Sequence, residues 1–313
     1  MAGEQRKYKS RIRATSTLQK VFRAMELIAA SRISKARTAA QGRDPYTEAV
    51  TRALQLVGNH RSEFDHPLLQ ERTDTNRVAV LVVTSDRGLA GAYNANVLRE
   101  AERFAEELKA DGKEPVLYVT GRRGIQTLSF RETEIAKSWE GESDNPSVEQ
   151  ANDIANTLLE AFTAPAEAGG VAAVHVVFTR YESMMKQTVQ VRHMFPLSIV
   201  DYGSGRIDRG AEKPVDYRGT GPAGSPPLYE IEPSGDEVFE ALIPMYVRQR
   251  IRTILLMAAA SELAARQQAM RAATDNANEL IEKYTRLANN ARQAEITTEI
   301  TEIVSGADAL GNR

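Results

Sequence analysis

The feature that most constrains the fold is a long C-terminal stretch, residues 236–305, whose only proline is Pro244 and which contains no glycine. Within it, apolar residues alternate spacings of three and four, the pattern of a coiled-coil seam. The predicted seam is Met270, Ala273, Ala277, Leu280, Tyr284, Leu287, Ala291 and Ala294. One helix over this stretch would be ~100 Å long, against ~40 Å for a compact chain of this size, so it must project from any globular body.

The N-terminal segment, residues 1–57, is predicted to supply the partner helix for that seam. Its apolar stripe at helical spacing is Leu18, Phe22, Met25, Ala29, Ile33 and Ala36. Gly42 and the Asp44–Pro45 pair should interrupt the helix, because proline lacks an N–H and restricts the residue before it. The two ends of the chain would then pair as an antiparallel coiled coil.

Residues 1–37 hold ten lysines and arginines but only two acids, a local charge of +8. Such a surface fits an acidic protein, anionic lipid or nucleic acid, or is simply a solvated helix face. The aromatic residues expected of a single-strand binder are not interleaved with these charges. This argues against single-stranded nucleic acid; no nucleic-acid partner of any kind is expected.

The middle of the chain, residues 77–200, alternates strand and helix patterns. The strands are predicted at 77–86, 115–121, 171–181 and 188–197, with helical patterns around 97–108, 122–130 and 145–163. A valine-rich run such as 77–86 is typical of a buried parallel strand. This order predicts a small, mainly parallel, Rossmann-like α/β domain inserted between the two terminal helices. Residues 203–235 are rich in glycine and proline and are expected to form a loop.

No pattern in the sequence predicts chemistry. The chain has no cysteine, its four histidines have no metal-ligand spacing, and no catalytic set is evident. The segment TSDRGLAG follows a strand and opens a helix, but it lacks both phosphate-binding glycine patterns, so a tight structural turn is favoured. We expect no catalytic residue, cofactor or metal. No apolar run is long enough for a membrane span, and the N-terminus lacks the apolar core of a signal peptide.

Three segments resemble the gamma subunit family of bacterial F-type ATP synthases. They are MELIAASRISKAR (25–37), TSDRGLAGAYNANV (84–97) and the long C-terminal segment 261–310. The resemblance covers essentially the whole chain, and the C-terminal match is the most specific. The stretch 203–227 is longer than is usual in the family, which leaves its path and its contacts with an epsilon subunit open.

The resemblance implies a non-catalytic rotating central stalk that couples proton flow through a membrane rotor to ATP synthesis or hydrolysis. The implied partners are three alpha subunits, three beta subunits, the epsilon subunit and the c-ring. It implies that Met25, Arg292 and Gln293 contact beta subunits and that Ile300, Ile303 and Val304 turn in an apolar bearing. The expected location is the cytoplasmic side of a bacterial cell membrane, as a peripheral protein.

Two other classes of protein share parts of this pattern. A dinucleotide-binding enzyme would use the α/β domain, and stabilisation by NAD or ATP would reveal it. A coiled-coil adaptor would share the architecture without the three family segments, and stable self-dimerisation would reveal it.

Overall fold

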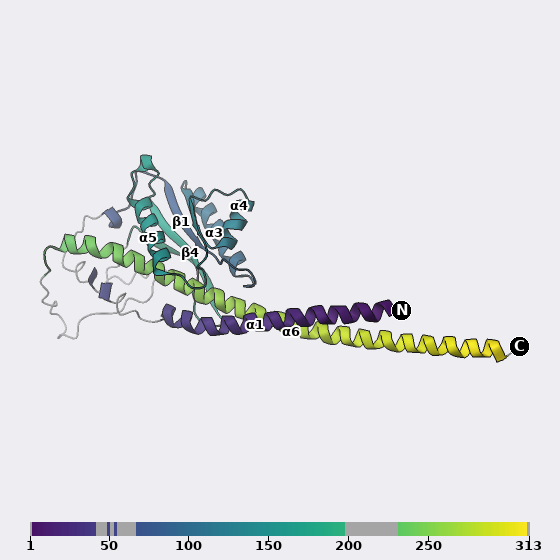
Figure 1. Ribbon diagram of the computed structural model, residues 1–313. Coiled ribbons are helices and arrows are strands. Elements are labelled where there is room, and N and C mark those ends of the chain that lie inside the picture. The colour runs from purple at the N-terminus through teal and green to yellow at the C-terminus, as the bar shows by residue number, and fades with distance from the viewer. Residues whose placement is uncertain (1, 42–48, 51–52, 55–66, 198–230, 312–313) are drawn as a thin grey trace. The chain divides into compact units, whose positions relative to one another are not determined.

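The computed structural model describes residues 2–41, 49–50, 53–54, 67–197 and 231–311 (Figure 1). Contacts divide the chain into two compact units: Arg32–Ala265, and Met1–Ser31 together with Arg266–Arg313. Two predicted features, the interruption at Gly42 to Pro45 and the long loop 203–227, lie outside the described residues.

A five-stranded sheet forms the centre of the unit Arg32–Ala265. Its strand order is β3-β2-β1-β4-β5, with the first four strands parallel and β5 antiparallel to β4. The strands are β1 (Arg77–Val83), β2 (Glu114–Thr120), β3 (Lys137–Trp139), β4 (Ala173–Tyr181) and β5 (Gln187–Phe195). In β1, all residues after Arg77 are buried, as expected for a central parallel strand covered on both faces. The predicted mainly parallel sheet is confirmed.

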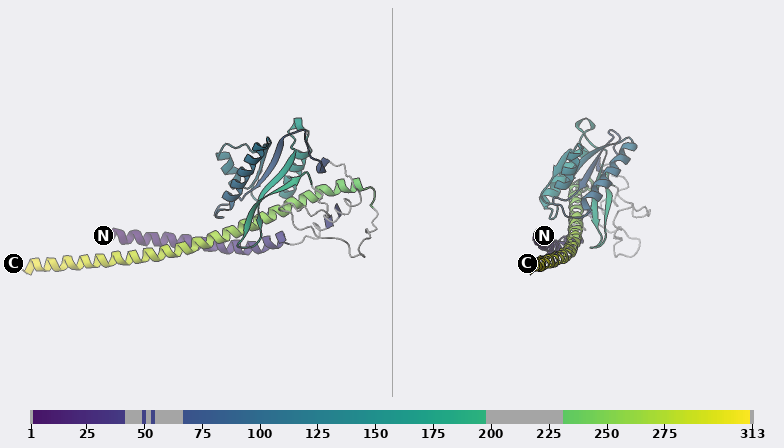
Figure 2. Two further views of the ribbon diagram at one scale, coloured as in Figure 1. Left: turned by 180° about the vertical axis from the view of Figure 1, so that it is seen from behind. Right: turned by 90° about the vertical axis from the view of Figure 1, so that its right-hand side faces the viewer.

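Helices cover both faces of the sheet and make three layers (Figures 1 and 2). The described helices of this body are α3 (Tyr93–Ala110), α4 (Arg122–Phe130), α5 (Val148–Thr163) and the first part of α6 (Gly235–Gly311). Alternate residues of β1 point to opposite faces. Val80 joins the core beneath α3 and α4, and Leu81 joins the core beneath α5 and α6.

Strand β3 was not predicted, because three residues are too few to give a period-two pattern. It lies at the edge of the sheet and pairs only three residues with β2. Trp139 is buried, and its indole N–H donates to Asp153 of α5, while the Lys137 ammonium lies 5.0 Å from the centre of the Trp139 ring. A short edge strand carrying a lysine discourages pairing with another chain.

Both ends of α5 are capped by side chains. At the start, the Ser147 hydroxyl accepts from the Gln150 N–H at 3.0 Å. At the end, the Arg72 guanidinium donates to the carbonyl of Ala164 at 2.7 Å and to that of Phe162. The cation therefore satisfies the last carbonyls of the helix and complements its dipole.

We expect Arg72→Ala to lower the free energy of unfolding by about 1–2 kcal/mol, because charged hydrogen bonds to partly buried carbonyls are lost. Urea denaturation monitored by circular dichroism measures the change. Arg72→Lys keeps the charge but loses the planar fork, so it should fall between alanine and the wild type. Equal stability of the alanine variant and the wild type would show that water replaces the cap.

The unit of residues 1–31 and 266–313 is a pair of antiparallel helices. It consists of the first part of α1 (Ala2–Gln41) and the last part of α6. The rings of Tyr8 and Tyr284 stack with centroids 6.4 Å apart, and the Gln19 amide donates to the Asn278 amide oxygen at 2.7 Å. A later residue of α1 thus contacts an earlier residue of α6, so the two helices run in opposite directions. Both chain ends lie at the same end of the pair (Figure 1). The predicted antiparallel pairing is confirmed.

Candidate functional surfaces

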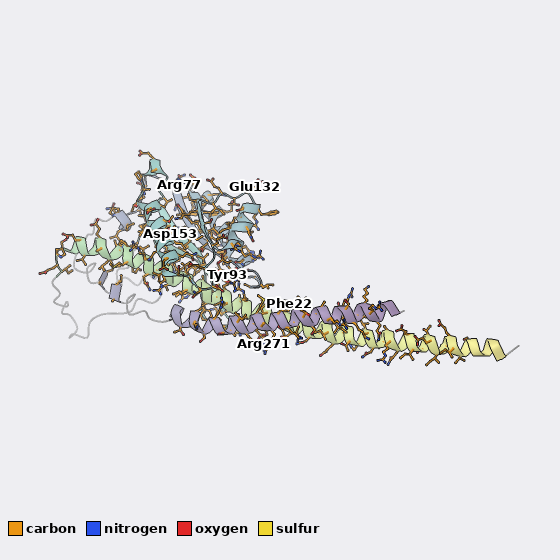
Figure 3. All side chains as sticks on the ribbon, in the orientation of Figure 1. Phe22, Arg77, Tyr93, Glu132, Asp153 and Arg271 are labelled. Carbon is orange, nitrogen blue, oxygen red and sulfur yellow. The ribbon has the colours of Figure 1, made fainter. Side chains whose placement is uncertain are left out.

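The carboxyl end of the sheet is where an α/β protein of this kind would bind a ligand, because the strand order reverses there between β1 and β4. In this chain helix α6 lies against that end of β4. The Ser261 hydroxyl, fully buried, donates to the Thr179 carbonyl at 3.0 Å. Tyr93 lies at the start of α3 (Figure 3). Its hydroxyl donates to the Ala258 carbonyl of α6 at 3.4 Å. The chain's own helix thus packs where a nucleotide would otherwise enter.

The backbone N–H groups in the first turn of α4 donate hydrogen bonds to the loop after β1. The Arg122 N–H donates to the Asp86 carboxylate at 3.0 Å, and the Arg123 N–H to the Ser85 carbonyl at 2.9 Å. The Gly124 N–H donates to the Thr84 hydroxyl at 3.0 Å. Free N–H groups at a helix start form an anion site, which phosphates use in nucleotide-binding folds. Here Asp86 supplies the anion from within the chain.

Asp86 also holds the loop between β3 and α5. Its carboxylate accepts from the Gly141 N–H at 2.9 Å and the Ser143 N–H at 2.8 Å, and its own N–H donates to the Ser143 hydroxyl at 2.8 Å. Partial burial alone would raise the pKa of this carboxyl. The N–H groups of Gly141, Ser143 and Arg122 outweigh burial, so the pKa of Asp86 lies below its usual range. The carboxylate is therefore a charged structural hub.

Two glycines allow β1 and α4 to approach this closely. Gly121 has φ of 98°, and a Cβ there would lie 2.2 Å from the Thr84 carbonyl oxygen. A Cβ on Gly124 would lie 2.5 Å from the Thr84 hydroxyl oxygen. Side chains at either position would displace the Thr84 contacts that satisfy α4.

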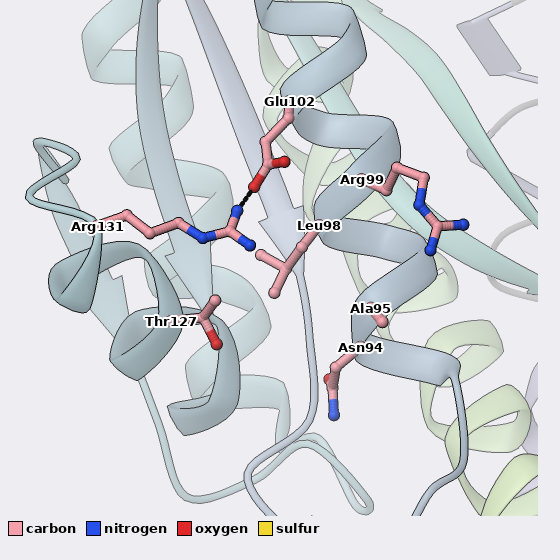
Figure 4. A pocket seen from close by; sticks show the side chains of 7 residues that line it. All are labelled: Asn94, Ala95, Leu98, Arg99, Glu102, Thr127 and Arg131. Atoms are coloured by element: carbon pink, nitrogen blue, oxygen red, sulfur yellow. Dashed lines mark ion pairs between the residues drawn. The ribbon is translucent and has the colours of Figure 1, made fainter.

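A surface cavity of about 320 Å³ lies between α3 and α4 (Figure 4). It is lined by Asn94, Ala95, Leu98, Arg99, Glu102, Thr127 and Arg131. The Arg131 guanidinium points to the Glu102 carboxylate and forms an ion pair with it, so these two charges satisfy each other. This open, polar site has neither the apolar lining nor the convergent polar groups of a typical cofactor pocket.

The two histidines within the described residues are cross-strand partners. His175 on β4 faces His193 on β5 with ring centroids 4.8 Å apart, and Phe104 of α3 packs on His175. Burial, reinforced by His193 and Lys113, lowers the pKa of His175 to about 3, so this imidazole is neutral at pH 7. Across the described part of the chain, no group of three or more histidine and acidic side chains is placed to hold a metal ion. His60 and His66 lie outside it.

The helix pair packs along a regular seam on each helix. On α1, the residues turned towards the partner helix are Gln5, Tyr8, Ile12, Thr15, Gln19, Phe22, Glu26 and Ala29. On α6 they are Met270, Thr274, Ala277, Ile281, Tyr284, Ala288, Ala291 and Glu295. Both sets alternate spacings of three and four, as a heptad seam requires.

The predicted seam residues are placed in two ways. Met270 and Ala277 are buried, and Tyr284 stacks on Tyr8 of the partner helix. Ala273, Tyr284, Leu287 and Ala291 are all half-buried, whereas Leu280 is 42% exposed and Ala294 is exposed. The packed positions are the next residues along, Thr274, Ile281, Ala288 and Glu295. At three of these four positions the prediction chose the more apolar or bulkier neighbour, whereas the packed residue is polar (Thr274, Glu295) or small (Ala288). At the fourth position, Ile281 is packed in place of Leu280.

On α1, Ala29 is buried and Phe22 and Met25 are half-buried, whereas Leu18 is 52% exposed. Leu18 and Met25 belong instead to a second apolar stripe, Leu18, Val21, Met25 and Ile28, again with spacings of three and four. Val21 and Ile28 are about half exposed. These two residues were not predicted from the sequence, although the same heptad count would have found them.

The far end of α6 is also exposed. Between Asn289 and Ser305, the part of this end whose side chains are described, no residue is buried. Arg292 and Gln293 are exposed, and Ile300, Ile303 and Val304 are 56%, 71% and 55% exposed. These three side chains therefore leave apolar surface uncovered near the end of α6.

Known proteins resemble this chain over its full length. The family model described as ATP synthase matches residues 4–310. The ATP synthase gamma chain of Beutenbergia cavernae is 57% identical over 310 residues, covering 99% of each chain. That of Acidothermus cellulolyticus is 51% identical, covering 99% of this chain and 98% of the relative.

Solved structures agree with the fold. A chain of the Euglena gracilis mitochondrial ATP synthase matches with a TM-score of 0.64 at 15% identity, covering 99% of this chain and 95% of that one. A chain of the rotor from the same organism's enzyme matches with a TM-score of 0.62 at 14% identity, covering 95% and 100%. With a whole-chain family match and relatives above 50% identity, the chain belongs to the ATP synthase gamma chain family.

Proposed function

We propose that this chain is the rotating central-stalk subunit of an F-type ATP synthase. It couples proton flow through the membrane rotor to ATP synthesis or hydrolysis in a hexamer of three alpha and three beta subunits. The observation that carries the proposal is that the helix pair of this gamma-family chain leaves apolar side chains exposed. They lie on the second stripe of α1 and at the end of α6. These surfaces suit a shaft that turns inside other subunits.

The shaft works because it has no three-fold symmetry while the surrounding ring does. One face of the helix pair carries the apolar stripe with Leu18 and Met25, and other faces are charged. Each beta subunit meets a different face, and differential contacts are what bias a protein between conformations. In this proposal Met25, Arg292 and Gln293 contact beta subunits, and Ile300, Ile303 and Val304 turn in an apolar sleeve.

The chain itself is proposed to carry out no bond chemistry. Asp86 fills the anion site at α4, and α6 packs over the carboxyl end of β4. The epsilon subunit and the c-ring are the proposed partners of the α/β domain, on the cytoplasmic side of the membrane. None of the described helices combines the length and the apolar character needed to cross a bilayer.

Assembly with catalytic subunits tests the proposal. We expect one copy of the chain per three alpha and three beta subunits, measured by native mass spectrometry, together with a changed ATPase rate. Val21→Glu with Ile28→Glu should weaken the complex, because two charges would enter an apolar interface. Phe130→Glu is the matched control, since Phe130 is 89% exposed on α4, outside the helix pair.

The failure outcomes are distinct. Absence of a complex together with stable self-association would favour the adaptor. Thermal stabilisation by NAD or ATP would favour the dinucleotide-binding enzyme.

A further inference from the structure

The segment of α1 from Arg32 to Ala36 is held by two different loops of the α/β domain. The Arg32 guanidinium forms an ion pair with Asp144, of the loop between β3 and α5, at 2.5 Å. The next residue, Ile33, is buried against Tyr181 of β4 and against Leu263 and Ala264 of α6. All of these residues lie in the same compact unit, Arg32–Ala265.

Asp144 lies in a turn held by several hydrogen bonds. The Asn145 N–H closes the turn by donating to the Glu142 carbonyl at 3.1 Å. The preceding residue, Ser143, is fixed to Asp86 by two hydrogen bonds of 2.8 Å. After the turn, the Ser147 N–H donates to the Glu142 carboxylate at 2.9 Å. The position of Asp144 is therefore set by the loop after β1, through Asp86.

The second loop is the turn between β4 and β5. Met184 of this turn packs with Ala36 around the cluster that contains Ile33. Consecutive residues of an α-helix point about 100° apart. Arg32 and Ile33 thus contact the domain from two faces of the helix, which opposes rolling of α1 about its own axis. By contrast, both residues of the Arg23–Glu26 ion pair belong to α1 itself.

We propose that α1 is tied to the α/β domain by a rotational clamp. The clamp consists of the Arg32–Asp144 ion pair, in which Asp144 is positioned by Asp86, together with the cluster around Ile33. The clamp rests on the proposed function: torque applied to the domain must reach both helices of the shaft, and α1 is held here by side-chain contacts. Arg32 is 47% exposed, so the ion pair contributes little to global stability. Its role is to suppress local rolling and opening of α1.

Hydrogen exchange on the full isolated chain tests the clamp directly. Arg32→Gln or Asp144→Asn should speed exchange at α1 amides around residues 32–36 about two- to fivefold, since a partly exposed pair is worth about 0.5–1 kcal/mol. The reversed pair, Arg32→Asp with Asp144→Arg, should restore slow exchange. Arg103→Gln, which removes exposed ion pairs within α3, should leave α1 exchange unchanged.

The single variant Arg32→Asp, also measured by exchange, is then compared with the reversed pair in the assembled, membrane-bound complex. We expect Arg32→Asp to lower proton pumping per ATP hydrolysed, and the reversed pair to recover it. Normal pumping and unchanged exchange in Arg32→Asp would overturn the clamp while leaving the central-stalk function intact. A wild-type chain that does not assemble would instead overturn the proposed function, and the exchange measurement on the isolated chain would still decide whether the ion pair holds α1.

Discussion

Replacing Asp86 with alanine is expected to lower the free energy of unfolding by about 2–3 kcal/mol. Three backbone N–H groups, those of Arg122, Gly141 and Ser143, lose a charged acceptor, and each orphaned donor costs about 1 kcal/mol or more. Partial exposure of the site limits the loss, because water can reach some of these groups. Urea denaturation at pH 7 measures the change.

The control separates charge from shape. Asp86→Asn keeps the volume and one acceptor oxygen, so its loss should be smaller than that of alanine. Removing the side chain also vacates an anion site at a helix start, so formate should stabilise Asp86→Ala more than it stabilises the wild type. If alanine and wild type unfold at the same urea concentration, with no effect of formate, Asp86 is not the hub that the contacts indicate.

The advantage of Asp86 over asparagine also depends on pH. The folded-state pKa lies below the ordinary value of 3.8, so the carboxylate stabilises the folded chain fully above that value. The stabilisation is lost as the pH falls through the lower, folded-state pKa, because protonation removes the charge. The difference between wild type and Asp86→Asn should therefore be constant from pH 7 to about 5 and should shrink only below pH 4. A difference that shrinks already between pH 7 and 6 would contradict this assignment.

The sheet could be predicted from the sequence because its strands carry strong local signals. The valine-rich β1 and the glycines after it mark a buried strand and a turn, and four of the five strands were found in this way. Strand β3 was missed because its three residues are ordered by pairing with β2, not by their own pattern. The antiparallel helix pair followed from length and periodicity alone.

The contacts that organise the functional surfaces join residues far apart in the chain. Asp86 and Gly141 are 55 positions apart, and Arg32 and Asp144 are 112 apart. Local pattern carries no signal for such pairs. The register of the helix seam is hard to predict for another reason: neighbouring residues such as Leu287 and Ala288 both fit a heptad count, and only the partner helix decides which one faces inward.

A bulky substitution on the packed face of α6 is expected to destabilise the helix pair. Ala277 is 4% exposed on the packed face of α6. Ala277→Leu should destabilise the helix pair by about 1–3 kcal/mol, because three added carbons force the helices apart or into strained rotamers. Hydrogen exchange at the amides of α1 and α6 measures this directly, with faster exchange expected on both helices around the substituted site.

Two controls make the result specific to the register. Ala272→Leu makes the same substitution at an exposed position of the same helix and should change stability by no more than about 0.5 kcal/mol. Leu280→Ala removes a large side chain that the heptad count alone places in the seam but that is 42% exposed, so it too should have little effect. A loss of about 2 kcal/mol or more for Leu280→Ala, the size expected when a buried leucine is truncated, would place Leu280 in the seam and overturn the register described above. With Leu280 outside the seam, the leucine is left free for a surrounding subunit, as a shaft turning inside a ring requires.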